Sequence, residues 1–257
     1  MNIKVIVATH KKYEMPEDQI YLPVQVGKAI NSSLEYIGDD TGENISHKNP
    51  NYCELTAMYW AWKNIDADYL GLVHYRRHFG SKSFFIGSEK KKNILTRDKA
   101  QELLKEYDAI FPKKRNYWIE TNKSQYTNAH YGKDLELTRD IINEKYPEYV
   151  NAFDKIMDKR SGHRFNMFVM KKELFDAYCE WLFDILFELE RNIDITNYCK
   201  YQARVFGFIS ERLLDVWLEV NNVNYTEIPV IHMEKQNWPK KIFQFIKRKF
   251  TINQLEM

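Results

Sequence analysis

Residues Tyr69–Gly80 read YLGLVHYRRHFG, and this stretch decides the fold because an apolar run ends abruptly in basic and aromatic side chains. The run Tyr69–Val73 predicts a buried β-strand, and the polar residues His74–His78 follow at its carboxyl end. In an open α/β sheet, ligands bind beyond the carboxyl ends of the strands. Paired arginines suit the flat, multi-oxygen geometry of a phosphate or carboxylate. The stretch therefore predicts an anion site at the edge of a sheet.

The alternative interpretation of these residues is an ion-pair cluster at a sheet edge. Side chains alternate between the two faces of a strand. We therefore expect His74 and Arg76 on one face, and Tyr75 and Arg77 on the other.

Other apolar runs around this strand alternate with helical patterns. Ile3–Thr9 is a β-branched run, which is typical of a strand buried on both faces. Further strands are expected at Leu22–Val26, Ala109–Pro112, His163–Met170 and Tyr225–His232, and helices at Glu54–Asn64, Asp98–Tyr107, Glu173–Arg191 and Tyr201–Val220. Strands separated by helices predict βαβ units. The expected fold class is α/β, with a mostly parallel central sheet and helical insertions.

Size and charge limit the classes of function. The chain has 257 residues, which is enough for one large α/β domain. Its 38 basic and 36 acidic side chains give a formal net charge of only +2. Nucleic-acid binding usually requires a strongly basic domain, so we expect no nucleic-acid partner.

The expected domain is residues 1–234, followed by a basic tail, residues 235–257. The tail has six Lys and Arg residues against Glu256 alone, interleaved with Ile and Phe. A cationic face beside an apolar face suits an anionic membrane surface. The alternative is a C-terminal helix that packs on the domain and exposes its basic face to solvent.

The cysteines and the N-terminal residues suggest a cellular location. Cys53, Cys179 and Cys199 are widely spaced and form no CxxC pair, which is typical of reduced thiols in a cytoplasmic protein. The N-terminal apolar run is too short for a signal peptide or a spanning helix. We expect a cytoplasmic protein that is peripheral on the inner face of the plasma membrane.

Several catalytic signatures are absent from the sequence. There is no GxxxxGK[ST], GxGxxG after the first strand, HExxH or GxSxG, so ATPase, dinucleotide, metalloprotease and serine-hydrolase functions lack their usual motifs. Asp66 and Asp68 match the letters of a DxD metal motif, but they precede a strand, and we interpret them as a helix-to-strand loop.

The segments GENISHKNPNYCELTAMYWAWKN, YLGLVHYRRHF, AIFPKK, QYTNAHYGKDLE and RVFGFISERLLDVWL together carry a resemblance. They resemble the bacterial capsular and exopolysaccharide glycosyltransferase family long described as a domain of unknown function. The resemblance extends from about Lys4 to His232 and implies a GT-A-like nucleotide-sugar fold. It also implies a UDP-sugar donor, galactofuranose in some members, and a lipid-linked glycan acceptor. Whether the protein requires a divalent metal, manganese or magnesium, is left open by the resemblance.

The resemblance also implies roles for particular residues. Those expected to bind the donor are Thr9, His10, Lys11, Asp40, Asn44, Glu54, Lys63, His74, Tyr75, Arg76 and Arg77. Asp40 and Asn44 have turn formation as their alternative. The arginines would neutralise the diphosphate.

An inverting transfer needs a carboxylate that takes a proton from the acceptor hydroxyl. Glu211, which we expect at the start of a helix, is the first candidate, and Asp134 is the second. The acceptor side is expected to contain Tyr126, His130, Tyr131, His163 and Asn166, with Arg164 beside them. His232 matches a late histidine that contacts metal or diphosphate in some sugar transferases, with a structural role as the alternative.

The sequence thus favours a UDP-sugar-dependent glycosyltransferase of surface-polysaccharide synthesis. A non-catalytic carbohydrate or anionic-lipid binding module is the alternative, because aromatic abundance and a basic tail would be sufficient for it.

Overall fold

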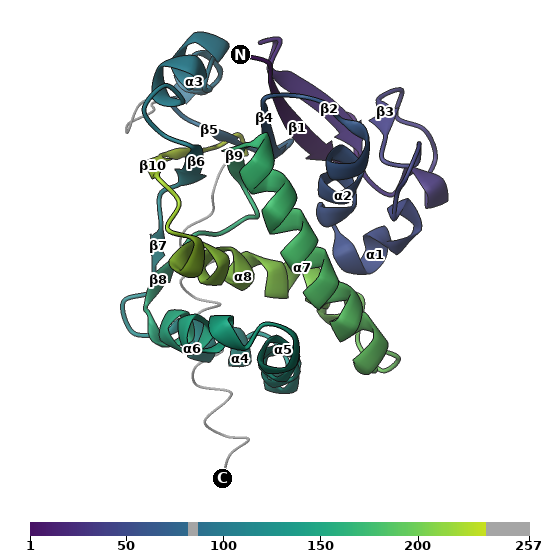
Figure 1. Cartoon of the computed structure of the whole chain (residues 1–257). Coiled ribbons are helices and arrows are strands. Elements are labelled where there is room, and N and C mark those ends of the chain that lie inside the picture. The colour runs from purple at the N-terminus through teal and green to yellow at the C-terminus, as the bar shows by residue number, and fades with distance from the viewer. Residues whose placement is uncertain (82–86, 235–257) are drawn as a thin grey trace.

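The computed structural model describes residues 1–81 and 87–234, and a nine-stranded sheet forms its centre (Figure 1). Its strands are β1 (Ile3–Thr9), β2 (Tyr21–Gln25), β3 (Ile37–Gly38), β4 (Tyr69–His74), β5 (Arg77–Phe79), β6 (Ala109–Pro112), β9 (Phe168–Lys171), β10 (Tyr225–Ile228) and β11 (Val230–His232). The main order is β10-β6-β9-β4-β1-β2-β3. β1 pairs in parallel with β2 and β4, and β6 with β10, whereas β9 is antiparallel to both β4 and β6. The predicted α/β fold with a mostly parallel sheet is confirmed.

The two faces of the sheet bury separate cores because side chains alternate along each strand. In β1, Ile6 and Ala8 join the core on one face, and Ile3, Val5 and Val7 join the core on the other. The first core is covered by α2 (Leu55–Asn64), α7 (Lys172–Asn192) and α8 (Val205–Asn221), and the second by α3 (Arg97–Leu103) (Figure 1). Burial on both faces explains why β1 is apolar except for Lys4 and Thr9.

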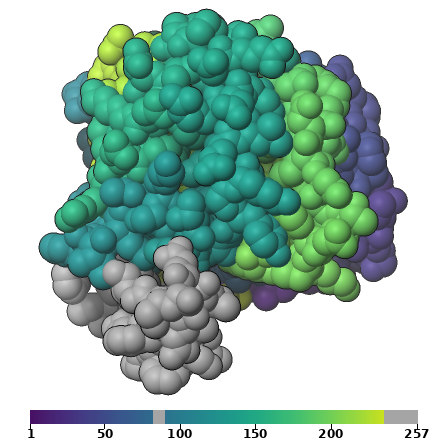
Figure 2. All heavy atoms as spheres, turned by 90° about the horizontal axis from the view of Figure 1, so that it is seen from below, coloured from purple at the N-terminus to yellow at the C-terminus, as the bar shows by residue number. Residues whose placement is uncertain are grey.

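A helical insertion follows β6 in the chain. It contains α4 (Asn122–Thr127), α5 (Gly132–Lys145) and α6 (Val150–Asp158), enclosed by the small antiparallel pair β7 (Arg115–Asn116) and β8 (Ser161–Gly162). Seen from below, this teal segment lies beside the green helices and covers much of the face (Figure 2). The expected helical insertion is therefore present.

The chain reverses direction immediately after β4. Strand β4 ends at His74, and His74 pairs with Arg77 at the start of the antiparallel strand β5. The expected alternation of residues 74 to 77 between two faces is therefore wrong, because the strand does not continue through them. The reversal places His74, Tyr75, Arg76 and Arg77 at one edge of the sheet.

Three predicted boundaries also differ from the structure. The strand expected at His163–Met170 is confined to Phe168–Lys171, because Phe165 and Asn166 have positive φ angles of 79° and 50°. The strand expected at Tyr225–His232 is divided at Pro229, which has no backbone N–H to donate to a ladder. The helix expected from Tyr201 begins at Val205, after a 3₁₀ turn.

The tail proposed to bind membranes, residues 235–257, lies outside the described residues. Within residues 1–81 and 87–234, none of the helices has the length and apolar character needed to cross a bilayer.

A substitution at Gly71 tests the close packing of the central strands β4 and β9. A Cβ added to Gly71 would lie 2.8 Å from the backbone oxygen of Phe168 on β9. We expect Gly71→Ala to lower the free energy of unfolding by about 1–3 kcal/mol, because a backbone atom cannot move away cheaply. Urea denaturation measures this change.

Gly207→Ala is the matched control. Its Cβ would lie 3.6 Å from the nearest atom of Cys53, an ordinary van der Waals distance. Gly207 lies within α8, where alanine is a better helix former than glycine, so the free energy of unfolding should be unchanged or higher. Equal stability of Gly71→Ala and the unsubstituted protein would contradict the close approach of β4 and β9.

Candidate functional site

A cavity of about 550 Å³ opens beyond the carboxyl ends of β1 and β4. Its wall contains seven of the residues predicted for the site, together with residues that the sequence did not single out. The predicted residues are His10, Glu54, His74, Tyr75, Arg76, Arg77 and Glu211, and the others include Cys53, Phe165, Tyr201, Arg204 and Phe208. The strand-end location is the one at which α/β sheets bind ligands.

The wall has more cationic than carboxylate side chains. It contains three arginines, Arg76, Arg77 and Arg204, against two glutamates, Glu54 and Glu211. Burial lowers the pKa of His10 and of His74, which favours neutral imidazoles. The balance suits an anionic ligand.

Arg77 is the cation whose surroundings are most unusual. Among the described residues, no carboxylate forms an ion pair with it, and its Nε atom is buried without a hydrogen-bond acceptor. Its guanidinium carbon lies 4.4 Å from the centroid of the Phe165 ring. Burial and the charge of Arg76 lower the pKa of Arg77, but an arginine remains charged at neutral pH. A half-buried cation with an unused, buried donor atom is suited to binding an external anion.

Arg76 and Lys11 form a more exposed group at the same edge. Glu234 lies between them, 3.7 Å from Nη1 of Arg76 and 3.5 Å from Nζ of Lys11. The ring of Tyr75 packs under this group, with Nζ of Lys11 5.0 Å from its centroid and the His10 ring edge-on at 5.3 Å. Long, exposed ion pairs contribute little stability, so an anionic ligand can displace Glu234 cheaply.

The dipeptide Phe165–Asn166, in the loop before β9, forms hydrogen bonds with two residues of the cavity wall. The carbonyl oxygen of Phe165 accepts a 2.5 Å hydrogen bond from Nε2 of His74. The side-chain amide of Asn166 donates to Oε1 of Glu54 at 2.7 Å, and its oxygen accepts from the Ser210 hydroxyl at 3.0 Å. Two consecutive non-glycine residues with positive φ are strained. This strain fixes His74 and Glu54 relative to each other.

Glu211 reaches the pocket from inside α8, in its second turn, and not from a helix start as expected. Its Oε2 lies 3.2 Å from Nη1 of Arg212, and its side chain is 23% exposed. Asp134, the other predicted base, is buried outside this cavity and accepts a 2.5 Å hydrogen bond from Tyr198. Burial raises the pKa of Asp134 although that hydrogen bond opposes the shift.

Five predicted donor-binding residues lie outside the cavity wall: Lys11, described above, and Thr9, Asp40, Asn44 and Lys63. The Thr9 hydroxyl donates to the carbonyl of Lys11 at 2.6 Å and closes the turn after β1. Asn44 accepts from the amide of Ser46 at 3.1 Å, as a turn-former does. Nζ of Lys63 lies 3.5 Å from the centroid of the Trp62 ring. Oδ1 of Asp40 is buried and has no hydrogen-bond partner in the described chain.

Of the predicted acceptor residues, His130 and Tyr126 pack in an aromatic layer next to the cavity. His130 stacks on Phe208 with ring centroids 4.0 Å apart, and Tyr201 packs on Phe208 at 5.2 Å. Tyr201 and Phe208 line the cavity, so His130 lies behind this wall. Tyr126 is fully buried under the Arg212 guanidinium, and Tyr131 packs on Tyr198 at the surface.

His163 and Arg164 are buried elsewhere as a polar network. Nδ1 of His163 lies 2.6 Å from Asp215, and Nε2 lies 3.2 Å from Glu227. Burial alone would lower the pKa of His163, but the two carboxylates outweigh it and raise that pKa above the usual value. The Arg164 side chain is held by Tyr117 and by the carbonyl of His163.

The His232 ring packs edge-on against Phe165 at 5.9 Å. In the part of the chain that the structure describes, His, Cys, Asp and Glu side chains form no group of three or more that could hold a metal.

Several pocket residues were not predicted. Cys53 has a φ of 54°, and its Sγ accepts a 3.0 Å hydrogen bond from Nε of Arg204. Burial, followed by the charge of Glu54, raises the pKa of Cys53 to about 11, which favours the protonated thiol. Tyr201 and Phe208 lie seven residues apart, a helical spacing that was the available signal for this wall.

The fold is α/β, and its cavity lies beyond the strand ends, the place where such sheets usually bind ligands. Residues 4–222 match the family described as "Domain of unknown function (DUF4422)", and the chain belongs to this family. The solved apo structure of the WbbM bifunctional glycosyltransferase is similar, with a TM-score of 0.85 and 34% sequence identity. The match covers 91% of this chain and 46% of that one, so the chain spans about half its length. Comparison with curated proteins gave no match.

The His163 network gives a pH-dependent prediction. Because the pKa of His163 is raised on folding, its stabilisation should be fully present below the unfolded-state pKa of about 6.5 and be lost as pH rises through the folded-state pKa. We expect the stability difference between the unsubstituted protein and His163→Gln to be largest near about pH 6 and to shrink towards about pH 9. Urea denaturation at both pH values measures it, with the exposed His47→Gln as control. A pH-independent difference would refute the ionised network.

Proposed function

We propose that this protein is a glycosyltransferase that moves a sugar from a UDP-sugar to a capsular or exopolysaccharide precursor. The observation that carries the proposal is the half-buried Arg77, whose Nε atom is buried and which no carboxylate of the described residues meets in an ion pair, in a strand-end pocket. The likeness to the WbbM bifunctional glycosyltransferase supports the choice of glycosyl transfer over other anion chemistry. Galactofuranose is the first donor sugar to test.

The arginines would bind the diphosphate of the donor. Nε of Arg77 is the buried donor, and Arg76 and Arg204 line the same cavity. Charge accumulates on the diphosphate as the bond to the sugar breaks, and fixed cations in a partly closed site stabilise it. Donor titrations with and without manganese or magnesium test whether a divalent metal adds to this charge.

Glu211 would act as the general base in an inverting transfer. Its carboxylate would take the proton from the acceptor hydroxyl while that oxygen bonds to the anomeric carbon and UDP leaves. Glu54 is held by Asn166 at 2.7 Å, which suits a fixed acceptor for a hydroxyl of the donor sugar. The two carboxylates would thus have separate roles.

The aromatic wall would receive the glycan. Tyr201 is 54% exposed and packs on Phe208 at the cavity wall. Exposed aromatic faces pack well on the apolar C–H faces of sugars. A lipid-linked acceptor would also bring the protein to an anionic membrane surface, for which residues 235–257 supply the basic side chains.

Arg77→Met tests the diphosphate site. Loss of one charge-assisted contact should raise the Kd for UDP by about 10- to 100-fold, measured by isothermal titration calorimetry. Arg115→Met, on the exposed strand β7, is the control and should leave the Kd unchanged. An unchanged Kd in Arg77→Met with an intact fold would rule out Arg77 as the anion ligand.

Glu211→Gln and Glu54→Gln separate the two carboxylates. We expect Glu211→Gln to lower kcat by about 10²- to 10⁴-fold with little change in UDP affinity. Glu54→Gln should mainly raise KM for the UDP-sugar. Steady-state UDP release gives both constants. If Glu54→Gln abolishes kcat while Glu211→Gln preserves it, the assignment of the base is wrong, and the absence of UDP release with every donor would favour a binding module.

A further inference from the structure

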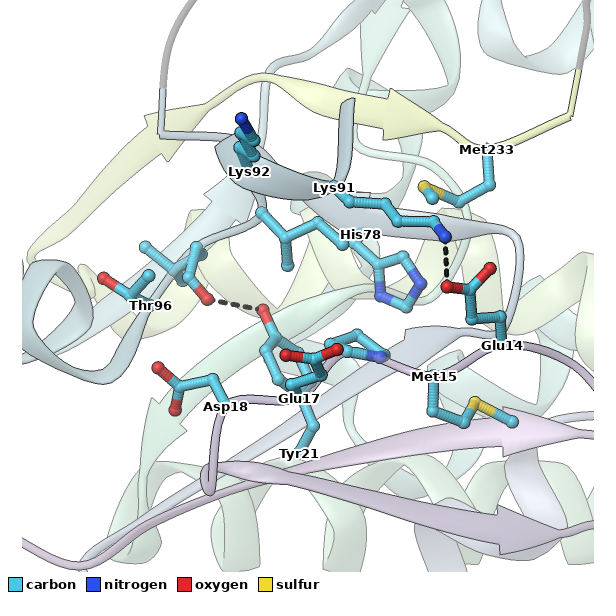
Figure 3. A pocket seen from close by; sticks show the side chains of 13 residues that line it. Glu14, Met15, Glu17, Asp18, Tyr21, His78, Lys91, Lys92, Thr96 and Met233 are labelled. Atoms are coloured by element: carbon cyan, nitrogen blue, oxygen red, sulfur yellow. Dashed lines mark hydrogen bonds and ion pairs between the residues drawn. The ribbon is translucent and has the colours of Figure 1, made fainter. Parts of the chain in front are cut away.

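A second cavity of about 440 Å³ lies on the α3 side of the sheet (Figure 3). It shares no described lining residue with the first cavity. Its wall combines apolar side chains from the core on that side with polar groups from the loop after β1. The lining includes Glu14, Met15, Glu17, Tyr21, His78, Lys91, Lys92, Leu95 and Met233. The volume is within the range of roughly 300–1,000 Å³ that is usual for small-molecule sites.

His78 is the last residue of the HYRRH run and lies in this wall. The proposed transfer reaction does not use it. Its side chain is 99% buried, and Nδ1 has no hydrogen-bond partner among the described residues. Nε2 lies 3.3 Å from the carbonyl oxygen of Tyr75. A carbonyl can only accept, so Nε2 carries the proton in this contact.

The free nitrogen of His78 is therefore a hydrogen-bond acceptor. Burial lowers the pKa of His78 to about 4, so the ring is neutral at physiological pH and Nδ1 presents a lone pair. A buried acceptor without a donor is costly, because it has lost its water. A ligand that satisfies it must bring an O–H or N–H group.

The remainder of the wall is less cationic than the first cavity and provides an apolar contact. Met15, Leu95 and Met233 supply apolar side chains. At the rim, Glu17 and Lys92 form no ion pair within the described ranges. The wall has three carboxylates against two lysines, so it is less suited to phosphate than the arginine-rich first cavity. An apolar face combined with acceptors and donors at the edge is the chemistry of a neutral saccharide.

An exposed ion pair lies beside the ring. Figure 3 shows Lys91 and Glu14 joined next to the His78 imidazole. The two side chains are 55% and 70% exposed, and exposed ion pairs contribute little stability. Separating this pair to admit a ligand next to the ring would therefore cost little.

We propose that this second cavity binds a neutral saccharide unit, one of whose hydroxyl groups donates to Nδ1 of His78. Its apolar face would pack on Met15 and Met233, and other hydroxyls would reach Glu17 and Lys92. The inference rests on the proposed function for its ligand class, because a glycosyltransferase that extends a polymer meets saccharide units beyond the one that reacts. The second cavity would hold the growing glycan at a distance from the transfer site.

Saturation-transfer NMR and calorimetry on the full chain test this site directly, without an activity readout. The probes are methyl galactosides and a galactose disaccharide, with inorganic phosphate as the anionic probe. We expect weak saccharide binding, in about the millimolar range, that persists with saturating UDP. His78→Leu should weaken it by at least about 10-fold, since the acceptor is lost. His78→Gln, which restores an acceptor oxygen, should recover part of the affinity, and the exposed His47→Leu should have no effect.

Thermal melting checks that His78→Leu folds, because this substitution also removes the 3.3 Å contact of Nε2 with the Tyr75 carbonyl. Saccharide binding that is absent, that His78→Leu leaves intact, or that UDP abolishes would overturn the proposal. The two proposals fail separately. A protein that does not bind UDP would refute the proposed transfer function, and saccharide binding that does not depend on His78 would refute the second site.

Discussion

The reversal of the chain between β4 and β5 is the constraint on which the site depends. β4 is buried on both faces up to Val73, and the pairing of His74 with Arg77 turns the chain back at the sheet edge. This geometry places the Arg77 guanidinium in a half-buried position where no carboxylate of the described residues forms an ion pair with it. The Phe165 ring gives it partial compensation. Burial of an incompletely paired cation is costly, and an arriving diphosphate would remove that cost.

The loop Phe165–Asn166 connects three distant segments of the chain through this site. It binds His74 after β4, Glu54 before α2 and Ser210 in α8. Each contact depends on a backbone conformation that non-glycine residues adopt rarely. The strain is therefore located where the geometry of the pocket must be fixed, as expected of a functional site. Such a connection also explains why residues far apart in sequence line one cavity.

The sequence predicted the sheet well and the site partly, for physical reasons. β6 is uniformly apolar, and β1 is apolar except for Lys4 and Thr9, because both faces are buried, so their positions are readable. The sequence predicted that HYRR follows a buried strand, and the structure places seven of the predicted residues at the wall of one cavity. The reversal at Tyr75–Arg76 was not readable, since no glycine, proline or asparagine marks it. The burial of His163 beside Asp215 and Glu227 comes from long-range packing that no local pattern encodes. Cys53 and Arg204 were missed for the same reason: they meet only in the folded chain.

A crystal structure of the protein soaked with UDP tests the central claim most directly. The account predicts the diphosphate in the cavity beyond β1 and β4, with an oxygen within about 3 Å of Nε of Arg77. A nucleotide bound elsewhere, with the Arg77 guanidinium still lying against Phe165 and touching no phosphate oxygen, would contradict it.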